Sequence, residues 1–171
     1  HVVKKIAGLD ADLVVLPELF STGYQFKDKA EALKLAEEIP NGYASKRLIE
    51  TAKAKKLHIV AGLVQRSGQR VYNSAVLIGP KGIVSVYRKA HLFWNERLIF
   101  SPGDTPFNVH DIGKAKIGMM ICFDWLFPEA VRTLALNGAD IICHPSNLVL
   151  PYCPAAMITR SIENRVYTIT A

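Results

Sequence analysis

The chain has 171 residues and a formal net charge of +6, and half of its residues are hydrophobic. This length fits one globular domain, and the absence of a long apolar segment or an opening signal peptide leads us to expect no membrane association. The basic residues are scattered, apart from KAKKL at 53–57, and aromatic residues do not interleave them, which argues against nucleic-acid binding.

The first half of the chain predicts one strand, two helices and then three strands. Hydrophobic spacing and turn residues place the strand at 12–17, the helices at 27–39 and 44–56, and the later strands at 57–65, 71–79 and 83–90. Short turns at Ser67-Gly68 and Pro80-Lys81-Gly82 separate the last three strands. We therefore expect these three to form an antiparallel meander.

The second half alternates strands with helices. Strands are predicted at 116–122, 139–145 and 166–171, and helices at 128–138 and 155–165. A strand, helix and strand in succession predict a crossover with parallel pairing, so the fold class is α/β with a mixed sheet covered by helices. The chain begins inside a helix-like pattern and stops inside an apolar strand. We therefore expect residues 1–171 to be one domain that lacks a first strand and its last strands.

The three cysteines are Cys122, Cys143 and Cys153. They are too few and too irregularly spaced for a disulfide framework, which predicts free thiols in a reducing, cytoplasmic setting. The grouping of Cys143, His144 and Cys153 matches no usual zinc spacing, so we expect no metal site.

Chemically useful side chains follow several predicted strands. Glu18 follows the first strand, Lys89 ends the third strand of the meander, and Cys122 ends the strand at 116–122. His144 and then Asn147 follow the next strand. Ligands of open α/β sheets bind outside the carboxyl ends of strands, so these groups are expected to project from one edge of one sheet.

A carboxylate, an ammonium group and a thiol form a coherent catalytic set. A thiol is a useful nucleophile only when a base or a positive field makes the thiolate available. Glu18 is a candidate for the base, and Lys89 for the positive charge. The backbone N–H of Phe123 is a second candidate donor to the charge that develops when Cys122 attacks a carbonyl or nitrile carbon.

Three motifs carry a family resemblance. VVLPELFSTGY around Glu18, YRKAHLF around Lys89 and GMMICFDWLFPE around Cys122 resemble the catalytic signatures of the nitrilase superfamily of carbon–nitrogen hydrolases. The order Glu, Lys, Cys matches too, and the similarity runs over essentially the whole chain. The resemblance implies an α-β-β-α sandwich with mixed sheets and outer helices. It also implies no metal or organic cofactor, and assembly into a homodimer or a higher homo-oligomer.

The resemblance also implies roles for the motif residues. Cys122 attacks the substrate, Glu18 acts as general base and acid, and Lys89 stabilises the tetrahedral intermediate before water hydrolyses a thioester. Glu96 matches the second carboxylate that many members place beside the triad. CFDWLFPE is most similar to the amidase and carbamoylase branches and to small archaeal nitrilase-type enzymes. We therefore expect a small aliphatic amide or N-carbamoyl substrate, with small nitriles as the alternative.

Two other readings stay open, a Cys-His hydrolase that uses His91 or His144, and a non-catalytic binding protein on the same fold. Expected substrate-binding residues are those that follow strand ends or the nucleophile. They are Tyr24, Phe123, Trp125 and Asn147. RSIENR at 160–165 is expected to form a buried polar network beneath the site.

Overall fold

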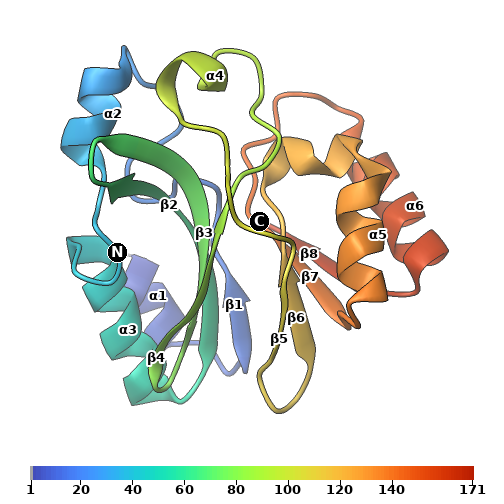
Figure 1. Ribbon diagram of the computed structural model, residues 1–171. Coiled ribbons are helices and arrows are strands. Elements are labelled where there is room, and N and C mark those ends of the chain that lie inside the picture. The colour runs from blue at the N-terminus through green and yellow to red at the C-terminus, as the bar shows by residue number, and fades with distance from the viewer. Residues whose placement is uncertain (1) are drawn as a thin grey trace.

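Two four-stranded sheets lie face to face, with helices on their outer faces, in the computed structural model, which describes residues 2–171 (Figure 1). The helices are α1 (Val2–Ala7), α2 (Lys29–Leu35), α3 (Tyr43–Lys55), α4 (Glu96–Ile99), α5 (Pro128–Leu136) and α6 (Cys153–Asn164), with a 3₁₀ turn η1 (Cys122–Leu126). The strands are β1 (Leu13–Val15), β2 (His58–Ser67), β3 (Arg70–Gly79), β4 (Gly82–Arg88), β5 (Val109–Asp111), β6 (Lys116–Met119), β7 (Ile141–His144) and β8 (Tyr167–Thr170).

The first sheet has the order β1-β2-β3-β4. β1 pairs in parallel with β2, and β2, β3 and β4 form the expected antiparallel meander. Because direction reverses twice between β2 and β4, β1 and β4 run the same way. The segments that follow these two strands therefore leave the sheet at the same edge.

The second sheet has the order β5-β6-β7-β8. β6, β7 and β8 are parallel neighbours, as the predicted crossover through α5 requires. β5 is an antiparallel edge strand that the sequence did not predict. The strand predicted at 116–122 ends early, at Met119, and the chain turns into η1 at Cys122.

Apolar side chains fill the space between the two sheets. Val60 and Leu77 of the first sheet pack in one cluster with Ile117, Met119 and Cys143 of the second, and all five are buried. Alternate residues of β2 point the other way, because side chains of a strand alternate between its two faces. This inner layer holds the two sheets together.

Helices cover both outer faces (Figure 1). Leu48 of α3 packs with Ile59 on the first sheet, and Leu134 of α5 packs with Ile142 on the second. The expected α-β-β-α sandwich is therefore confirmed.

One local expectation for α6 is wrong. Arg160 and Glu163 form an ion pair at 3.0 Å, and Asn164 donates to the backbone oxygen of Arg160 at 2.9 Å, but Glu163 is exposed and the other two residues are only half-buried. RSIENR is thus not a buried network beneath the site. Within residues 2–171, no helix is long and apolar enough to cross a bilayer.

Candidate active site

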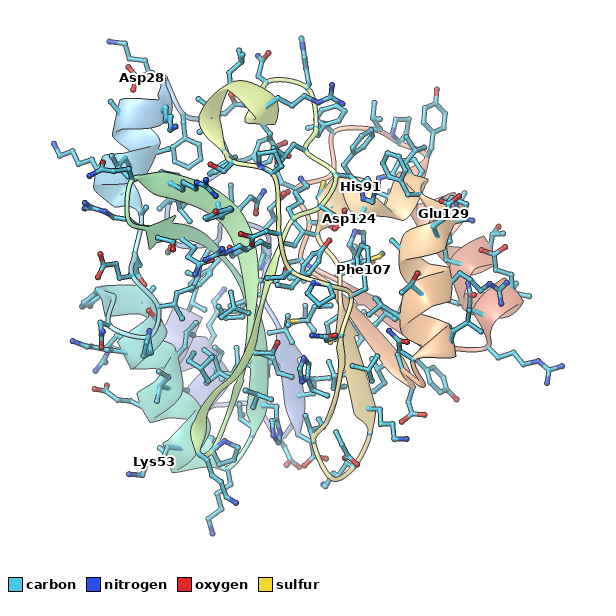
Figure 2. The ribbon with its side chains drawn as sticks, viewed as in Figure 1. Asp28, Lys53, His91, Phe107, Asp124 and Glu129 are labelled. Atoms are coloured by element: carbon cyan, nitrogen blue, oxygen red, sulfur yellow. The ribbon has the colours of Figure 1, made fainter. Side chains whose placement is uncertain are left out.

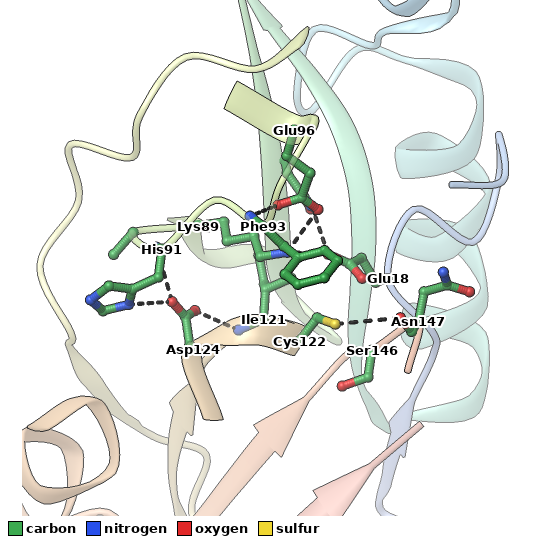
Figure 3. A network of polar contacts seen from close by, with 12 residues as sticks. Glu18, Lys89, His91, Phe93, Glu96, Ile121, Cys122, Asp124, Ser146 and Asn147 are labelled. Atoms are coloured by element: carbon green, nitrogen blue, oxygen red, sulfur yellow. Dashed lines mark hydrogen bonds and ion pairs between the residues drawn. The ribbon is translucent and has the colours of Figure 1, made fainter. Parts of the chain in front are cut away.

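Glu18, Lys89, Glu96 and Cys122 converge at one end of the sandwich (Figure 3). Glu18 and Lys89 follow β1 and β4 of the first sheet, Glu96 begins α4, and Cys122 follows β6 of the second sheet. The expectation of a single sheet edge is therefore wrong. The four side chains come from both sheets. The two sheets face each other across the apolar inner layer, which brings the ends of β1, β4 and β6 close together.

Lys89 lies between two carboxylates. Its Nζ is 2.7 Å from Oε1 of Glu18 and 2.8 Å from Oε1 of Glu96. The Lys89 side chain is fully buried, and both acids are almost so. A buried charge requires paired partners, and the two carboxylates supply them. The second oxygen of Glu96 accepts the backbone N–H of Phe93 at 2.7 Å, which fixes its direction.

Asn73 of β3 completes this cluster, and the sequence analysis did not identify it. Its Nδ2 donates to Oε1 of Glu18 at 2.7 Å and to Oε1 of Glu96 at 3.2 Å, and its backbone oxygen accepts the N–H of Lys89 at 2.8 Å. The available signal was a single amide inside the mostly apolar run VYNSAVLIG. A buried amide requires partners, and here those partners are the charged groups of the site.

The charges shift one another's proton affinities. Burial raises the pKa of Glu18, and the nearby charge of Glu96 adds to that rise, whereas Lys89 and the hydrogen bond from Asn73 oppose it. Burial lowers the pKa of Lys89, but the carboxylates of Glu18 and Glu96 outweigh it and raise the value to about 12. Lys89 is therefore a permanent cation at neutral pH.

Two glycines allow the site-bearing segments to approach the rest of the fold closely. A Cβ placed on Gly62 of β2 would lie 2.5 Å from the Cα of Glu18. A Cβ on Gly103 would lie 2.6 Å from the backbone oxygen of Lys89. Neither space admits a methyl group without moving backbone. These glycines therefore set how deeply the two residues sit.

Cys122 occupies a strained turn. Its φ of +38° lies in a region that non-glycine residues rarely adopt, and such strain typically costs about 1–3 kcal/mol. Its N–H donates to Pro145 O at 2.9 Å, and its Sγ lies 3.5 Å from Asn147 O. Burial and the charge of Glu18 raise the thiol pKa to about 12 despite the opposing effect of Lys89. The resting thiol is therefore protonated at neutral pH and requires a base.

Asp124 ties this turn to the Lys89 segment. Its Oδ2 accepts the N–H of Ile121 and the hydroxyl of Tyr87, each at 2.8 Å. Its Oδ1 accepts the N–H of His91 at 3.1 Å and contacts the ring Nδ1 at 2.7 Å. Figure 2 shows His91 and Asp124 side by side near Phe107. Tyr87 and His91 lie two residues before and after Lys89. The Asp124 carboxylate therefore fixes the position of the cysteine turn relative to Lys89. Asp124 was not among the residues expected at the site from the sequence.

Both candidate histidines are occupied elsewhere. Burial lowers the pKa of His144 to about 4, so its ring is neutral at pH 7. Nε2 lies 2.9 Å from the backbone oxygen of Cys122, which only accepts, and Nδ1 lies 3.0 Å from the Thr170 hydroxyl. The ring of His91 is bound to Asp124. Neither histidine has a ring nitrogen directed at the thiol, so the geometry does not favour a Cys-His pair.

A cavity of about 740 Å³ adjoins the charged cluster, and Tyr24 and Glu96 lie in its wall. Most of the wall is apolar or aromatic. Its members include Phe26, Phe93, Trp94, Ile99, Phe100, Val149 and Leu150. Burial and the charges of Glu96 and Glu18 raise the pKa of Tyr24, so its hydroxyl keeps its proton at neutral pH. Tyr24 is thus available as a neutral hydrogen-bonding group next to the site.

The other expected substrate-binding residues lie in different places. Phe123 lines a smaller hollow of about 320 Å³ together with His91 and Phe127. Trp125 packs in the core under α5 and α6 and is not part of either wall, because η1 turns its ring inward. Asn147 contacts the thiol through its backbone oxygen. Across residues 2–171, no cluster of three or more His, Cys, Asp or Glu side chains is arranged to hold a metal ion.

The chain is similar to known proteins over almost its whole length. The model of the carbon–nitrogen hydrolase family matches residues 1–171. A protein named nitrilase from Pyrococcus abyssi is 52% identical over 99% of this chain and 64% of its own length. An (R)-stereoselective amidase from Pseudomonas is 34% identical over 94% of this chain and 58% of its own length.

A solved structure shares the fold. The carbon–nitrogen hydrolase from Helicobacter pylori G27 superposes with a TM-score of 0.88 at 25% identity, covering 99% of this chain and 64% of that one. The chain thus spans less than two thirds of the length of these relatives. The expected oligomeric assembly and the expectation that residues 1–171 form a single domain stay predictions. The family model, the relatives and the fold together show that this chain belongs to the carbon–nitrogen hydrolase family.

Proposed function

We propose that the protein hydrolyses a carbon–nitrogen bond of a small molecule through a thioester on Cys122. The observation that carries this proposal is the buried Glu18–Lys89–Glu96 cluster, which faces a protonated thiol on a strained turn. A structural core has no need of three charged groups around one thiol. Burial of paired charges is costly, which favours the catalytic reading over a non-catalytic binding protein.

In the first half-reaction Glu18 takes the proton from Sγ as the sulfur bonds to the carbonyl carbon. The electron pair of the C=O bond moves to oxygen, where Lys89 supplies a fixed positive charge. The N–H of Phe123, which precedes the first internal bond of η1, is the second donor. Collapse of this intermediate breaks the C–N bond, and the Glu18 proton goes to the departing amine.

In the second half-reaction water attacks the thioester carbon. Glu18, now ionised again, takes a proton from that water and returns it to the sulfur as the C–S bond breaks. The products are an acid and ammonia or an amine. Glu96 does not transfer a proton in this scheme. It balances the charge of Lys89 and holds its Nζ in place.

For the substrate we propose small aliphatic amides or N-carbamoyl compounds. The sequence CFDWLFPE supports this choice, and so does the 34% identity to a protein named amidase. Small nitriles are the second candidate, because the 52% identical Pyrococcus abyssi protein is named nitrilase. The mainly apolar cavity wall fits an uncharged substrate body in either case.

Ammonia release from matched pairs, each an aliphatic amide and its corresponding nitrile, tests the proposal. We expect release from the amide with burst kinetics if the thioester accumulates. Release from the nitrile alone would replace the amide by the nitrile. No release from amide, N-carbamoyl compound or nitrile, with the protein folded, would contradict the proposed function.

A further inference from the structure

The two oxygens of Glu18 have unequal surroundings. Oε1 accepts from Nζ of Lys89 and from Nδ2 of Asn73, both at 2.7 Å. Oε2 is buried and has no hydrogen-bond partner among the described residues. A buried carboxylate oxygen without a donor is costly, and such an atom in a native fold requires an explanation. The structure therefore distinguishes one bound oxygen from one vacant acceptor in the same carboxylate.

We propose that Asn73 is a positioning residue for the general base, because it binds Oε1 of Glu18 and so leaves Oε2 as the oxygen that receives the thiol proton. This inference rests on the proposed function. In the step, the S–H bond of Cys122 breaks and an O–H bond forms at Oε2. The electron pair stays on sulfur and forms the bond to the substrate carbon.

A neutral amide suits this position better than another charged group would. Nδ2 of Asn73 also donates to Oε1 of Glu96 at 3.2 Å, so one nitrogen spans the two acids. A second cation would lower the pKa of Glu18 further and make it a weaker base, whereas a third acid would repel both carboxylates. The amide orientation is also determined, since the reverse orientation would place Oδ1 against two carboxylate oxygens. Asn73 therefore fixes direction without changing the net charge of the cluster.

The hydrogen bond from Asn73 also stabilises the ionised form of Glu18. The titratable and polar groups around Glu18 are Lys89, Glu96, Asn73, the thiol of Cys122 and the hydroxyl of Tyr24. Of these, Lys89 and Asn73 lower the pKa of Glu18 against the larger effect of burial. Loss of the Asn73 donor should therefore raise that pKa. The acid limb of any reaction that needs ionised Glu18 should move to higher pH.

The test compares Asn73→Leu and Asn73→Asp with Ser74→Ala. Leu has a similar size and no donor, whereas Asp keeps the shape and adds a negative charge. Ser74 is the matched control, because it is the next residue of β3, is buried, and donates to Gln65 rather than to the site. Two rates are measured against pH, which are kcat/KM for ammonia release and the alkylation rate of Cys122 by iodoacetamide, read by mass spectrometry.

We expect the acid limb of both rates to move up by about one pH unit in Asn73→Leu, with a fall of about 10-fold below the limb. The shift should be larger in Asn73→Asp and absent in Ser74→Ala. Should Asn73→Leu not fold, the isosteric Asn73→Asp carries the comparison. Lower rates with an unmoved acid limb would make Asn73 merely structural and overturn the proposal.

The alkylation measurement separates this inference from the proposed function. It needs no substrate turnover, since it follows only the proton transfer that frees the sulfur. If no amide or nitrile is hydrolysed but the alkylation limb shifts, the role of Asn73 stands and the function fails. If hydrolysis is found but neither limb shifts, the function stands and the role of Asn73 is overturned.

Discussion

The two sheets contribute to the candidate site in different ways. The first sheet supplies side chains that bind one another, since Glu18, Lys89 and Asn73 share close hydrogen bonds and ion pairs. The second sheet supplies Cys122, whose backbone N–H is bound to Pro145 O and whose Sγ lies 3.5 Å from Asn147 O. The charged half is thus fixed by mutual attraction, and the nucleophilic half by a strained turn.

This difference separates stability from reactivity. Removing the Lys89 cation leaves two buried carboxylates without compensation, so both fold and activity should respond. Removing the thiol leaves no charge unpaired, so only activity should respond. Four substitutions test the comparison directly. Cys122→Ala, Glu18→Gln and Asp124→Asn run from the largest expected effect on rate to the smallest, and Lys89→Ala contrasts with Glu18→Gln in stability.

Cys122→Ala should lower ammonia release by about 10⁴-fold or more, because no other group can form the thioester. The free energy of unfolding should fall by only about 1 kcal/mol, since one small, nearly buried atom is lost. Ammonia assays and thermal unfolding measure the two effects. Cys143→Ala is the matched control, as its thiol lies between the sheets. Activity retained in Cys122→Ala would rule out covalent catalysis.

Glu18→Gln should lower the rate by about 10²- to 10⁴-fold, because the amide cannot accept the thiol proton. Its stability should behave differently. Folding raises the pKa of Glu18 above its usual value of 4.5. Protonated Glu18 therefore stabilises the fold below pH 4.5, and this stabilisation is lost as the pH rises through the raised pKa. Gln resembles the protonated form. The variant should therefore be at least as stable as the wild type at pH 7.

Lys89→Ala should change stability in the opposite direction to Glu18→Gln. The pKa of Lys89 is raised from 10.5 to about 12, so its contribution is complete below 10.5 and lost as the pH rises through about 12. At pH 7 its removal leaves two buried acids unpaired and should cost about 3–5 kcal/mol. Urea unfolding of both variants at pH 7 checks the contrast. Equal destabilisation by Glu18→Gln and Lys89→Ala would contradict it.

Asp124→Asn should have the smallest effect of the three, a fall in kcat of about 10- to 100-fold with little change in KM. The substitution replaces an acceptor of four contacts from the Lys89 segment and the cysteine turn by a group that accepts on one side only. Asp140→Asn is the control, because Asp140 accepts the N–H of Lys116 far from the site. An unchanged kcat in Asp124→Asn would show that the halves need no such tie.

Segments with a clear apolar run or a helical period were predictable from the sequence, but β5 and α4 were not. The meander follows from the mostly apolar stretches of β2 and β3 and from the turn residues between the strands, and the crossover follows from the helical spacing of apolar residues in α5. β5 has three residues and α4 has four, too few to show a period. The strand predicted at 116–122 is longer than β6, which ends at Met119. Met120 and Ile121 are apolar and buried, so in the sequence they look like a continuation of the strand.

The candidate site divides in the same way. Glu18, Lys89 and Cys122 follow strands, so their positions in the chain predict that they meet, and motif resemblance added Glu96. Asn73 lies inside a strand, where only its partners reveal its role. Whether an aromatic residue after the nucleophile points inward depends on the course of η1. The path of the backbone through η1 cannot be predicted from Trp125 and its neighbours in the sequence.

Gly62 carries no functional group, yet the backbone of Glu18 rests against it at a separation that excludes any side chain. Variant libraries that aim to change the substrate range would vary residues of the cavity wall and would not include Gly62. A library that varies β2 would lose activity at position 62, because any side chain there would displace the backbone of Glu18 although Gly62 does not line the cavity. Engineering of this protein should therefore hold positions 62 and 103 as glycine while the wall residues are exchanged.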